Sequence, residues 1–168
     1  MRVLGWEKGE LVPMTLADWD TEEGTITMVI QGLGSSSMMM NRMEVGDAFT
    51  GIAGPLGLPS RLHRYEKGET VAFCAGGVGL PPVYPIMREH LAMGNHVTLI
   101  AGFRSKDLMF WTEPDERIGL LQAQYPDLLD VSYTTNDGSF GIGGFATTPL
   151  GEMLAAARSA RSSPSARR

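Results

Sequence analysis

The sequence predicts an all-β segment followed by an α/β segment. Residues 1–31 carry a succession of short strand signals, whereas residues 70–104 alternate strand, turn, helix and strand. The second pattern is a βαβ unit, which requires a parallel sheet and a right-handed crossover. Signals for a third strand and a last helix follow as far as about residue 157. This order predicts two small domains with a cleft between them.

Composition narrows the class of protein. The chain has 168 residues, of which 43% are apolar and 20% charged, as in soluble globular proteins. Its formal net charge of −5 argues against a broad nucleic-acid-binding surface. No apolar run reaches about 18 residues and the start lacks the apolar core of a signal peptide, so we expect no membrane span and a cytoplasmic location. The single cysteine, Cys74, is expected to be a small core residue, and it excludes a disulfide framework or a Cys₄ metal site within this chain.

Turns divide the first part of the chain into short elements. Alternation of apolar residues favours strands, although Pro13 limits its segment to an edge strand or a bulge. A small-residue turn at 32–37 precedes a short helical turn at 38–43, and paired glycines and prolines make 54–60 irregular. The predicted strands are residues 1–4, 12–16, 25–31 and 48–53.

The central unit is bounded by clear start and stop signals. Apolar runs predict strands at 71–75 and 97–101. Between them a helix is predicted at 83–92, which Gly94 and Asn95 end. Strand, turn, helix and strand in this order make one βαβ unit.

The turn before this helix has the chemistry of an anion site. Glycines let a ligand approach the backbone, and the unpaired N–H groups and dipole of a helix start favour a phosphate. Gly77-Val78-Gly79, followed by Leu-Pro-Pro, meets half of the dinucleotide fingerprint, and Arg104 stands where an acid is usual after the second strand. Taken alone, the turn fits a dinucleotide site and a plain tight turn equally well.

The last third of the chain continues the α/β pattern. Ser105 is predicted to cap a helical segment at 105–116, and Asn136–Ser139 is a strong turn signal. The other predicted elements are a helix at 118–123, a strand at 129–134 and a helix from 148 to about 157. The tail from Arg158 is rich in serine, arginine and alanine and is predicted to be disordered.

A polar connector at 61–68 is the predicted domain boundary. The chain is accordingly divided into a domain at 1–67, a domain at 68–157 and a basic tail at 158–168.

Six motifs, in this order, carry a resemblance to a known family. They are GELVPMT at 9–15, GSSS at 34–37, GPLGLPS at 54–60, CAGGVGLPPVYPI at 74–86, AGFRSKDLMFWTEPDE at 101–116 and TTNDGSFGIGGFAT at 134–147. Through them the chain resembles the ferredoxin–NADP reductase superfamily as far as about residue 157. Within it, the chain is most similar to the alpha subunits of NADH-dependent ferredoxin–NADP oxidoreductases (sulfide dehydrogenase flavoproteins) and to the electron-transfer subunits of dihydroorotate dehydrogenases.

The resemblance implies a fold and an activity. The first domain would be an incomplete antiparallel FAD-binding β-barrel and the second a Rossmann-like NAD(P)-binding parallel sheet, with the chain truncated at both ends. Hydride would pass between NAD(P)H and FAD, and electrons would then leave through iron–sulfur clusters. The implied partners are an iron–sulfur or larger flavoprotein subunit of the same complex and a ferredoxin-like acceptor. The family's [2Fe–2S] cysteines are absent here, and neither a nucleic acid nor a membrane is expected as a partner.

The resemblance also implies which residues meet the cofactors. Pro13 and Thr15 would lie along the flavin edge, with the Thr15 hydroxyl near N5 as the candidate catalytic group. The FAD pyrophosphate would be held by the backbone of Gly34, Ser35, Ser36 and Ser37, an anion nest that needs no charged side chain. The cleft between flavin and nicotinamide would be bordered by Gly54, Pro55, Leu56 and Gly57. The NAD(P) pyrophosphate would be held by Gly76, Gly77, Val78, Gly79 and Pro81. The adenosine end would lie near Thr135, Asp137, Gly138 and Ser139, with Arg104 either meeting a phosphate or serving as a surface charge.

The chain departs from the family in ways that leave an alternative open. Leu11 replaces an arginine that would neutralise the flavin phosphate, and the first barrel strands and the last cysteine-bearing strand are missing. His63, His90 and His96 have no ligand spacing, so no metal site is predicted. Their lack of an acid–base pattern suits flavin chemistry, where the cofactor carries the reaction. The alternative is a truncated, non-catalytic nucleotide-binding or scaffold subunit.

Overall fold

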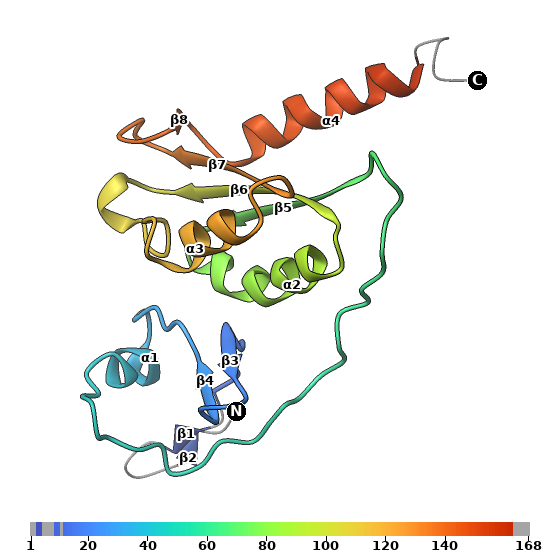
Figure 1. The fold of residues 1–168 in the computed structure, drawn as a ribbon. Helices are drawn as coiled ribbons and strands as arrows, with labels where there is room; N and C mark the ends of the chain where they lie inside the picture. The colour runs from blue at the N-terminus through green and yellow to red at the C-terminus, as the bar shows by residue number, and fades with distance from the viewer. Residues whose placement is uncertain (1–2, 5–8, 11, 163–168) are drawn as a thin grey trace. The chain divides into compact units, whose positions relative to one another are not determined.

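The computed structural model describes residues 3–4, 9–10 and 12–162, arranged in two compact units (Figure 1). The first unit comprises residues 1–62 with 81–86, and the second comprises 63–80 with 87–168. An antiparallel β part precedes a Rossmann-like parallel sheet along the chain, which confirms the predicted fold class.

Two short antiparallel hairpins and one helix make up the regular structure of the first unit. Strand β1 (Val3–Leu4) pairs with β2 (Gly9–Glu10), and β3 (Asp18–Asp20) pairs with β4 (Thr25–Thr27). Helix α1 spans Ser35–Met40. Between residues 12 and 62 of this unit, the buried apolar residues are Ala17 and Met40.

Several predicted elements of this unit are wrong in extent. Residues 12–16 form no strand, because Pro13 has no N–H to donate to a ladder. The strand predicted at 25–31 ends at Thr27, and 48–53 is irregular. The helix begins at Ser35 rather than residue 38, because the Ser37 hydroxyl accepts the Gly34 N–H and caps an earlier start.

The second unit is built on a four-stranded sheet in which every neighbouring pair is parallel. The strand order is β5-β6-β7-β8, one strand more than the three predicted. The strands are β5 (Thr70–Gly76), β6 (His96–Phe103), β7 (Leu129–Thr135) and β8 (Ile142–Gly143). The α-helices are α2 (Leu80–Ala92), of which residues 81–86 are grouped with the first unit, α3 (Arg117–Gln124) and α4 (Thr147–Ser162). The 3₁₀ turns are η1 (Gly77–Gly79) and η2 (Lys106–Leu108).

Helices cover the two faces of this sheet unequally. In Figure 1, α2 and α3 lie on one face and α4 starts on the other and runs away from it. Leu91 of α2, Leu99 of β6 and Ile118 of α3 are each fully buried, so the core lies between the sheet and the first two helices. On α4, by contrast, Leu154 is exposed. Just before α4, Ala146 packs closely against Gly102 of β6, where an added Cβ would lie 2.8 Å from Cβ of Ala146.

Three predictions for this unit need correction. The predicted helix at 105–116 is a single 3₁₀ turn, because the chain turns at Trp111 in a left-handed conformation (φ 65°). The tail predicted to be disordered from Arg158 is helical as far as Ser162, since alanine and arginine favour helix; its remainder at 163–168 lies outside the described residues. Cys74 is exposed, because its side chain alternates with that of Phe73, which faces His90 of α2, and its Sγ lies 3.6 Å from the Ala146 oxygen on the other face.

Within the described part of the chain, no helix is both long enough and apolar enough to span a membrane.

Replacing Gly141 with alanine should destabilise the second unit. Gly141 has φ +63°, and a Cβ there would overlap the carbonyl oxygen of Tyr133. The expected loss is about 3 kcal/mol or more in the free energy of unfolding, from backbone strain plus steric overlap. Gly138→Ala is the matched control, because its φ of +72° carries the strain while nothing lies within 4 Å. Urea unfolding of both variants tests this, and equal losses would contradict it.

Candidate functional site

Three loops of the second unit emerge at one edge of the sheet. Gly76 of β5 pairs with Gly102 of β6, and Phe103 of β6 pairs with Thr135 of β7. Because parallel strands end at a common edge, the turns after β5, β6 and β7 are brought side by side. In open α/β sheets this carboxyl edge is where ligands bind. The predicted nucleotide-binding residues of the second unit all lie in or next to these turns.

The turn after β5 presents an open stretch of backbone. Gly77 has φ +47°, a conformation that side-chain-bearing residues rarely adopt. Added Cβ atoms at Gly76, Gly77 and Gly79 would meet nothing within 4 Å. A ligand can therefore approach the main chain here without displacing protein atoms.

The start of α2 supplies fewer donors than an ordinary helix start. The N–H of Leu80 is bonded to the carbonyl oxygen of Gly77, and Pro81 and Pro82 have no N–H. Donors to an anion must come from the glycine turn itself, Gly77–Gly79, aided by the helix dipole. The prolines therefore limit anion binding to the glycine turn and disfavour it at the first helical residues.

A serine joins the loop after β6 to the loop after β7. The Ser139 hydroxyl oxygen accepts the Lys106 N–H at 2.8 Å, and its O–H donates to Asp137 Oδ1 at 2.6 Å. Backbone bonds add to this, since Asn136 N–H donates to the Phe103 oxygen at 3.0 Å. Ser139 thus lies in the loop after β7, with its side chain engaged by protein groups.

Thr135 also has its side chain occupied. Its buried hydroxyl accepts the Phe140 N–H at 2.9 Å and donates to the Phe140 oxygen at 2.7 Å. This closes the loop from β7 to β8 upon itself. The Thr135 hydroxyl therefore shapes the loop. A ligand at this edge would meet the neighbouring exposed groups instead.

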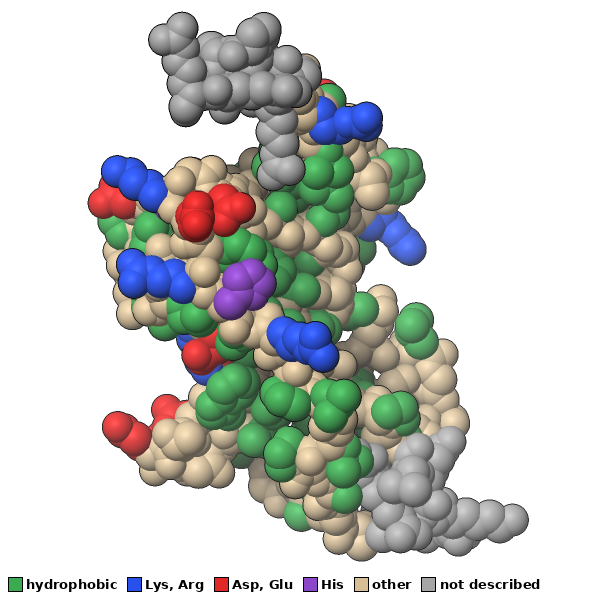
Figure 2. Space-filling model, turned by 90° about the vertical axis from the view of Figure 1, so that its right-hand side faces the viewer, with side chains coloured by type: hydrophobic (Ala, Val, Ile, Leu, Met, Phe, Trp, Pro, Cys, Tyr) green, Lys and Arg blue, Asp and Glu red, His purple; other side chains and the backbone are tan. Residues whose placement is uncertain are grey.

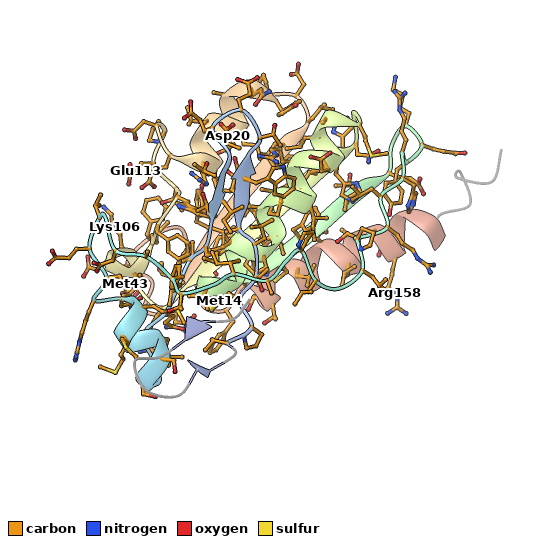
Figure 3. All side chains as sticks on the ribbon, turned by 90° about the horizontal axis from the view of Figure 1, so that it is seen from below. Met14, Asp20, Met43, Lys106, Glu113 and Arg158 are labelled. Carbon is orange, nitrogen blue, oxygen red and sulfur yellow. The ribbon has the colours of Figure 1, made fainter. Side chains whose placement is uncertain are left out.

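The edge carries both signs of charge. The Ser139 hydroxyl, and then the Ser139 N–H, lower the pKa of the exposed Asp137 carboxyl below its usual value. Arg104 is exposed where β6 ends, and the Lys106 ammonium lies 5.8 Å from the centroid of the Phe140 ring. Figure 3 shows Lys106 at the outer rim of the molecule. This combination suits a ligand that presents both phosphates and hydroxyl groups.

The candidate residues of the first unit lie on separate stretches. Pro13 and Thr15 are exposed in the irregular segment before β3, and Leu11 lies outside the described residues. Gly54–Gly57 is exposed and irregular, with a cis peptide bond before Pro55 and φ +97° at Gly57. Leu56, between them, is 77% exposed, which leaves a large apolar side chain in contact with solvent.

The predicted pyrophosphate nest at Gly34–Ser37 is partly used by the protein. The Ser37 hydroxyl oxygen accepts N–H groups from Leu33 at 3.0 Å and Gly34 at 2.9 Å, and its O–H donates to the Gly34 oxygen at 3.1 Å. Of the expected backbone donors, that of Gly34 is already bonded. Ser35 and Ser36 follow as the first residues of α1.

Sequence reasoning missed two residues that shape the edge. Phe140 closes on Thr135 and lies under Lys106, which no local pattern indicated. The second is Gly102, which lets Ala146 pack closely. Its position inside a strand was a usable signal, because a glycine within a strand often marks a close backbone approach.

Comparisons with known proteins agree with this geometry. No family model matches the chain. It is 32% identical over 148 residues to the dihydroorotate dehydrogenase B (NAD(+)) electron transfer subunit homolog of Thermotoga maritima, covering 88% of this chain and 48% of that protein. It is 30% identical over 141 residues to the corresponding electron transfer subunit of Shouchella clausii, covering 84% and 50%. The chain thus spans about half the length of the curated relatives it matches.

Solved structures give the same picture. A structure of NADH-dependent reduced ferredoxin-NADP oxidoreductase, a protein of flavin-based electron bifurcation, matches with a TM-score of 0.76 and 30% identity over 91% of this chain and 51% of that one. The cytochrome b5 reductase domain of Ulva prolifera nitrate reductase matches in fold, with a TM-score of 0.60 and 19% identity over 86% and 63%. The resemblance that the motifs predicted is confirmed. The curated homologues of the chain are electron-transfer subunits of oxidoreductases.

Removing the Ser139 hydroxyl should loosen the edge. In Ser139→Ala the Lys106 N–H and the Asp137 carboxylate lose their partner, so the pKa of Asp137 should rise toward its usual value and the melting temperature should fall slightly. A ¹³C-detected pH titration of Asp137 and thermal unfolding measure the two effects. Ser105→Ala is the control, because Ser105 makes no side-chain cap bond to η2. An unchanged Asp137 titration would show that the bond does not form in solution.

Proposed function

We propose that the chain is part of a flavoprotein oxidoreductase in which hydride passes between NAD(P)H and FAD and electrons pass on to an iron–sulfur partner. The observation that carries this proposal is the open glycine backbone of Gly76–Gly79 at the carboxyl edge of a parallel sheet. The similarity to electron-transfer subunits and to an NADH-dependent oxidoreductase supports the same reading.

The second unit is proposed to bind NAD(P). The glycine turn and Val78 would receive the pyrophosphate, because no Cβ occupies the space in front of Gly76, Gly77 and Gly79. Pro81 would support this turn as part of α2. At the other end of the edge, Arg104 offers a cation, while Asp137, Gly138 and Ser139 present a carboxylate and a turn to the adenosine half.

The first unit is proposed to bind FAD. Ser35–Ser37 would hold its pyrophosphate through backbone N–H groups, with Gly34 setting the extended entry to α1. Pro13 and Thr15 would line the flavin edge, with the exposed Thr15 hydroxyl able to donate a hydrogen bond there. Gly54–Gly57 would border the ring. When bound, the flavin supplies the capacity to accept hydride and release electrons one at a time.

The proposed partners follow from the similarity to electron transfer subunits, which work with other redox proteins. An iron–sulfur or larger flavoprotein subunit and a ferredoxin-like acceptor would receive the electrons. Within the described residues, no group of three or more histidine, cysteine or acidic side chains is placed to hold a metal ion. The cytoplasmic location expected from the sequence stays a prediction.

A second candidate is a nucleotide-binding subunit without hydride transfer. The observation that favours it is a hydrogen bond within the predicted flavin nest, in which the Gly34 N–H donates to the Ser37 hydroxyl oxygen. Such a protein would bind NAD(P) in the second unit and leave flavin unreduced.

Flavin content separates the two functions. Purified chain incubated with FAD should retain a yellow absorbance after desalting, and NADH or NADPH should bleach it under anaerobic conditions. Calorimetry with NAD⁺ and NADP⁺ is run in parallel. Nucleotide binding without retained FAD would support the binding subunit, whereas the absence of both would contradict each function. Repeating the assay with co-expressed neighbouring subunits identifies a flavin site that needs a partner.

A single methyl group should test the glycine turn. Gly79 has φ −77° and open space around it, so Gly79→Ala should fold unchanged. The methyl group would stand where the pyrophosphate approaches, and NAD(P) affinity should fall about tenfold, or 1.4 kcal/mol. Gly151→Ala is the control, since Gly151 is equally open but lies on α4, away from the edge. Equal affinities in both variants would place the nucleotide elsewhere.

A further inference from the structure

We propose that Asn95 clamps the backbone of the connector at His63–Tyr65 onto the second unit, and that protonation of His90 opens this clamp. The connector is the stretch where the chain passes from the first unit to the second, with the boundary between Leu62 and His63. The clamp would make the freedom of the connector depend on pH. This inference concerns the second unit alone and does not depend on the proposed redox function.

The clamp consists of two hydrogen bonds that flank Arg64. Oδ1 of Asn95 accepts the Tyr65 N–H at 2.8 Å, and Nδ2 of Asn95 donates to the His63 oxygen at 3.0 Å. A side-chain amide thereby reproduces the donor and acceptor pair that a neighbouring strand would offer an extended backbone. Asn95 is buried and directly follows the turn that ends α2, so its position is set by the core rather than by the connector.

The same amide determines the protonation state of His90. Nδ2 of Asn95 lies 2.9 Å from Nδ1 of His90, which is buried on α2. The two connector bonds fix which end of the amide carries hydrogen, so Nδ2 can only donate to the imidazole. Nδ1 must then be the acceptor, which requires neutral His90 with its proton on Nε2. A proton on Nδ1 would place two donors face to face and break the bond.

The groups around His90 oppose its protonation. Burial, and then the charge of His63, lower the pKa of His90 below its usual 6.5. From the connector, the Tyr65 ring lies 5.9 Å from that of His90, and Phe73 of β5 lies 6.0 Å away on the other side. Within the described residues, no carboxylate contributes to the shift.

Other charged groups near this corner are mostly cationic. Arg64 reaches to 3.9 Å from where a Cβ on Gly94 would stand, and His96 begins β6 beside Asn95. Arg88 and Glu89 precede His90 on its own helix and are half-buried. Protonated His90 would therefore face the charge of His63 as well as lose its hydrogen bond.

The sign of the pH dependence follows directly. A histidine whose pKa is lower in the clamped form binds fewer protons there than when released, where its pKa is near 6.5. The clamp is at full strength above about pH 6.5. It weakens as the pH falls below that value and reaches its minimum below the pKa of the clamped form.

Limited trypsin digestion of the full chain measures the clamp directly. Trypsin cleaves after Arg64, between the two clamped groups, and after Arg61, which precedes them. The measured quantity is the initial rate of cleavage after Arg64 divided by that after Arg61, followed by mass spectrometry. This ratio cancels the pH dependence of the protease itself. At pH 8 the ratio should be low in the native protein and about tenfold higher in Asn95→Ala, since two hydrogen bonds are lost and cleavage follows the open population. Between pH 8 and 5.5 the native ratio should rise.

Two histidine variants assign the pH response. His90→Gln keeps an acceptor for Asn95 and cannot be protonated, so its ratio should not change with pH. His63→Gln should retain the rise, because the clamp holds the His63 backbone and not its ring. Circular dichroism confirms that each variant is folded. For a measurement without any substitution, ¹⁵N shifts of the His90 ring at pH 8 should show a proton on Nε2.

The proposal would be overturned by a native ratio that does not vary with pH, or by an undiminished pH response in His90→Gln. An Nδ1-protonated ring at pH 8 would also overturn it. If Asn95→Ala cannot be folded, the His90→Gln profile and the ring tautomer decide between the outcomes.

Discussion

Parallel pairing of β5 with β6 and of β6 with β7 is the constraint on which the second unit depends. The pairing runs from Thr70 opposite His96 to Gly76 opposite Gly102, and from Val97 opposite Leu129 to Phe103 opposite Thr135. A shift by one residue would turn every side chain to the opposite face and expose Leu99. Because the register is held by this buried face, the turns that follow the three strands are forced to a common edge. The candidate site is thus a consequence of core packing.

Small hydroxyl side chains then join and close the loops that the strand register brings together. Ser139 joins two loops that the sheet only places side by side, and Thr135 closes the loop that follows β7. Ser37 does the same for the start of α1 in the first unit. In each case a hydroxyl satisfies backbone groups that a loop would otherwise leave to water. The cost is that these hydroxyls are engaged within the protein, which leaves the glycine turn and the exposed charges to meet a ligand.

The two units differ in how much apolar surface they bury. The second unit buries leucine, isoleucine and methionine side chains between its sheet and helices, whereas Ala17 and Met40 are the buried apolar residues described for 12–62. Leu33, Val45 and Leu58 are at least 80% exposed, and Figure 2 shows apolar side chains at the surface on the face it displays. Two hairpins of two and three residues per strand bury too little surface to be stable independently. The first unit is therefore the part whose stability depends most on further contacts.

The sequence by itself determined the order of β and α/β segments, the βαβ unit and the edge at which its glycine turn would lie. These features depend on local patterns, namely apolar runs, glycine and proline positions and the period of the helix from Leu80 to Ala92. Sequence reasoning failed at 12–16, where Pro13 has no N–H for a ladder, at 48–53, which is irregular, and at 105–116, where the chain turns at Trp111. Only the tertiary structure decided that β8 joins the sheet, that Cys74 is exposed and that the hydroxyls of Thr135 and Ser139 are already bonded. It also decided that Asn95, which the sequence showed only as a helix stop, binds a backbone 30 residues earlier in the chain. Such contacts depend on distant segments meeting in space, which no local pattern encodes.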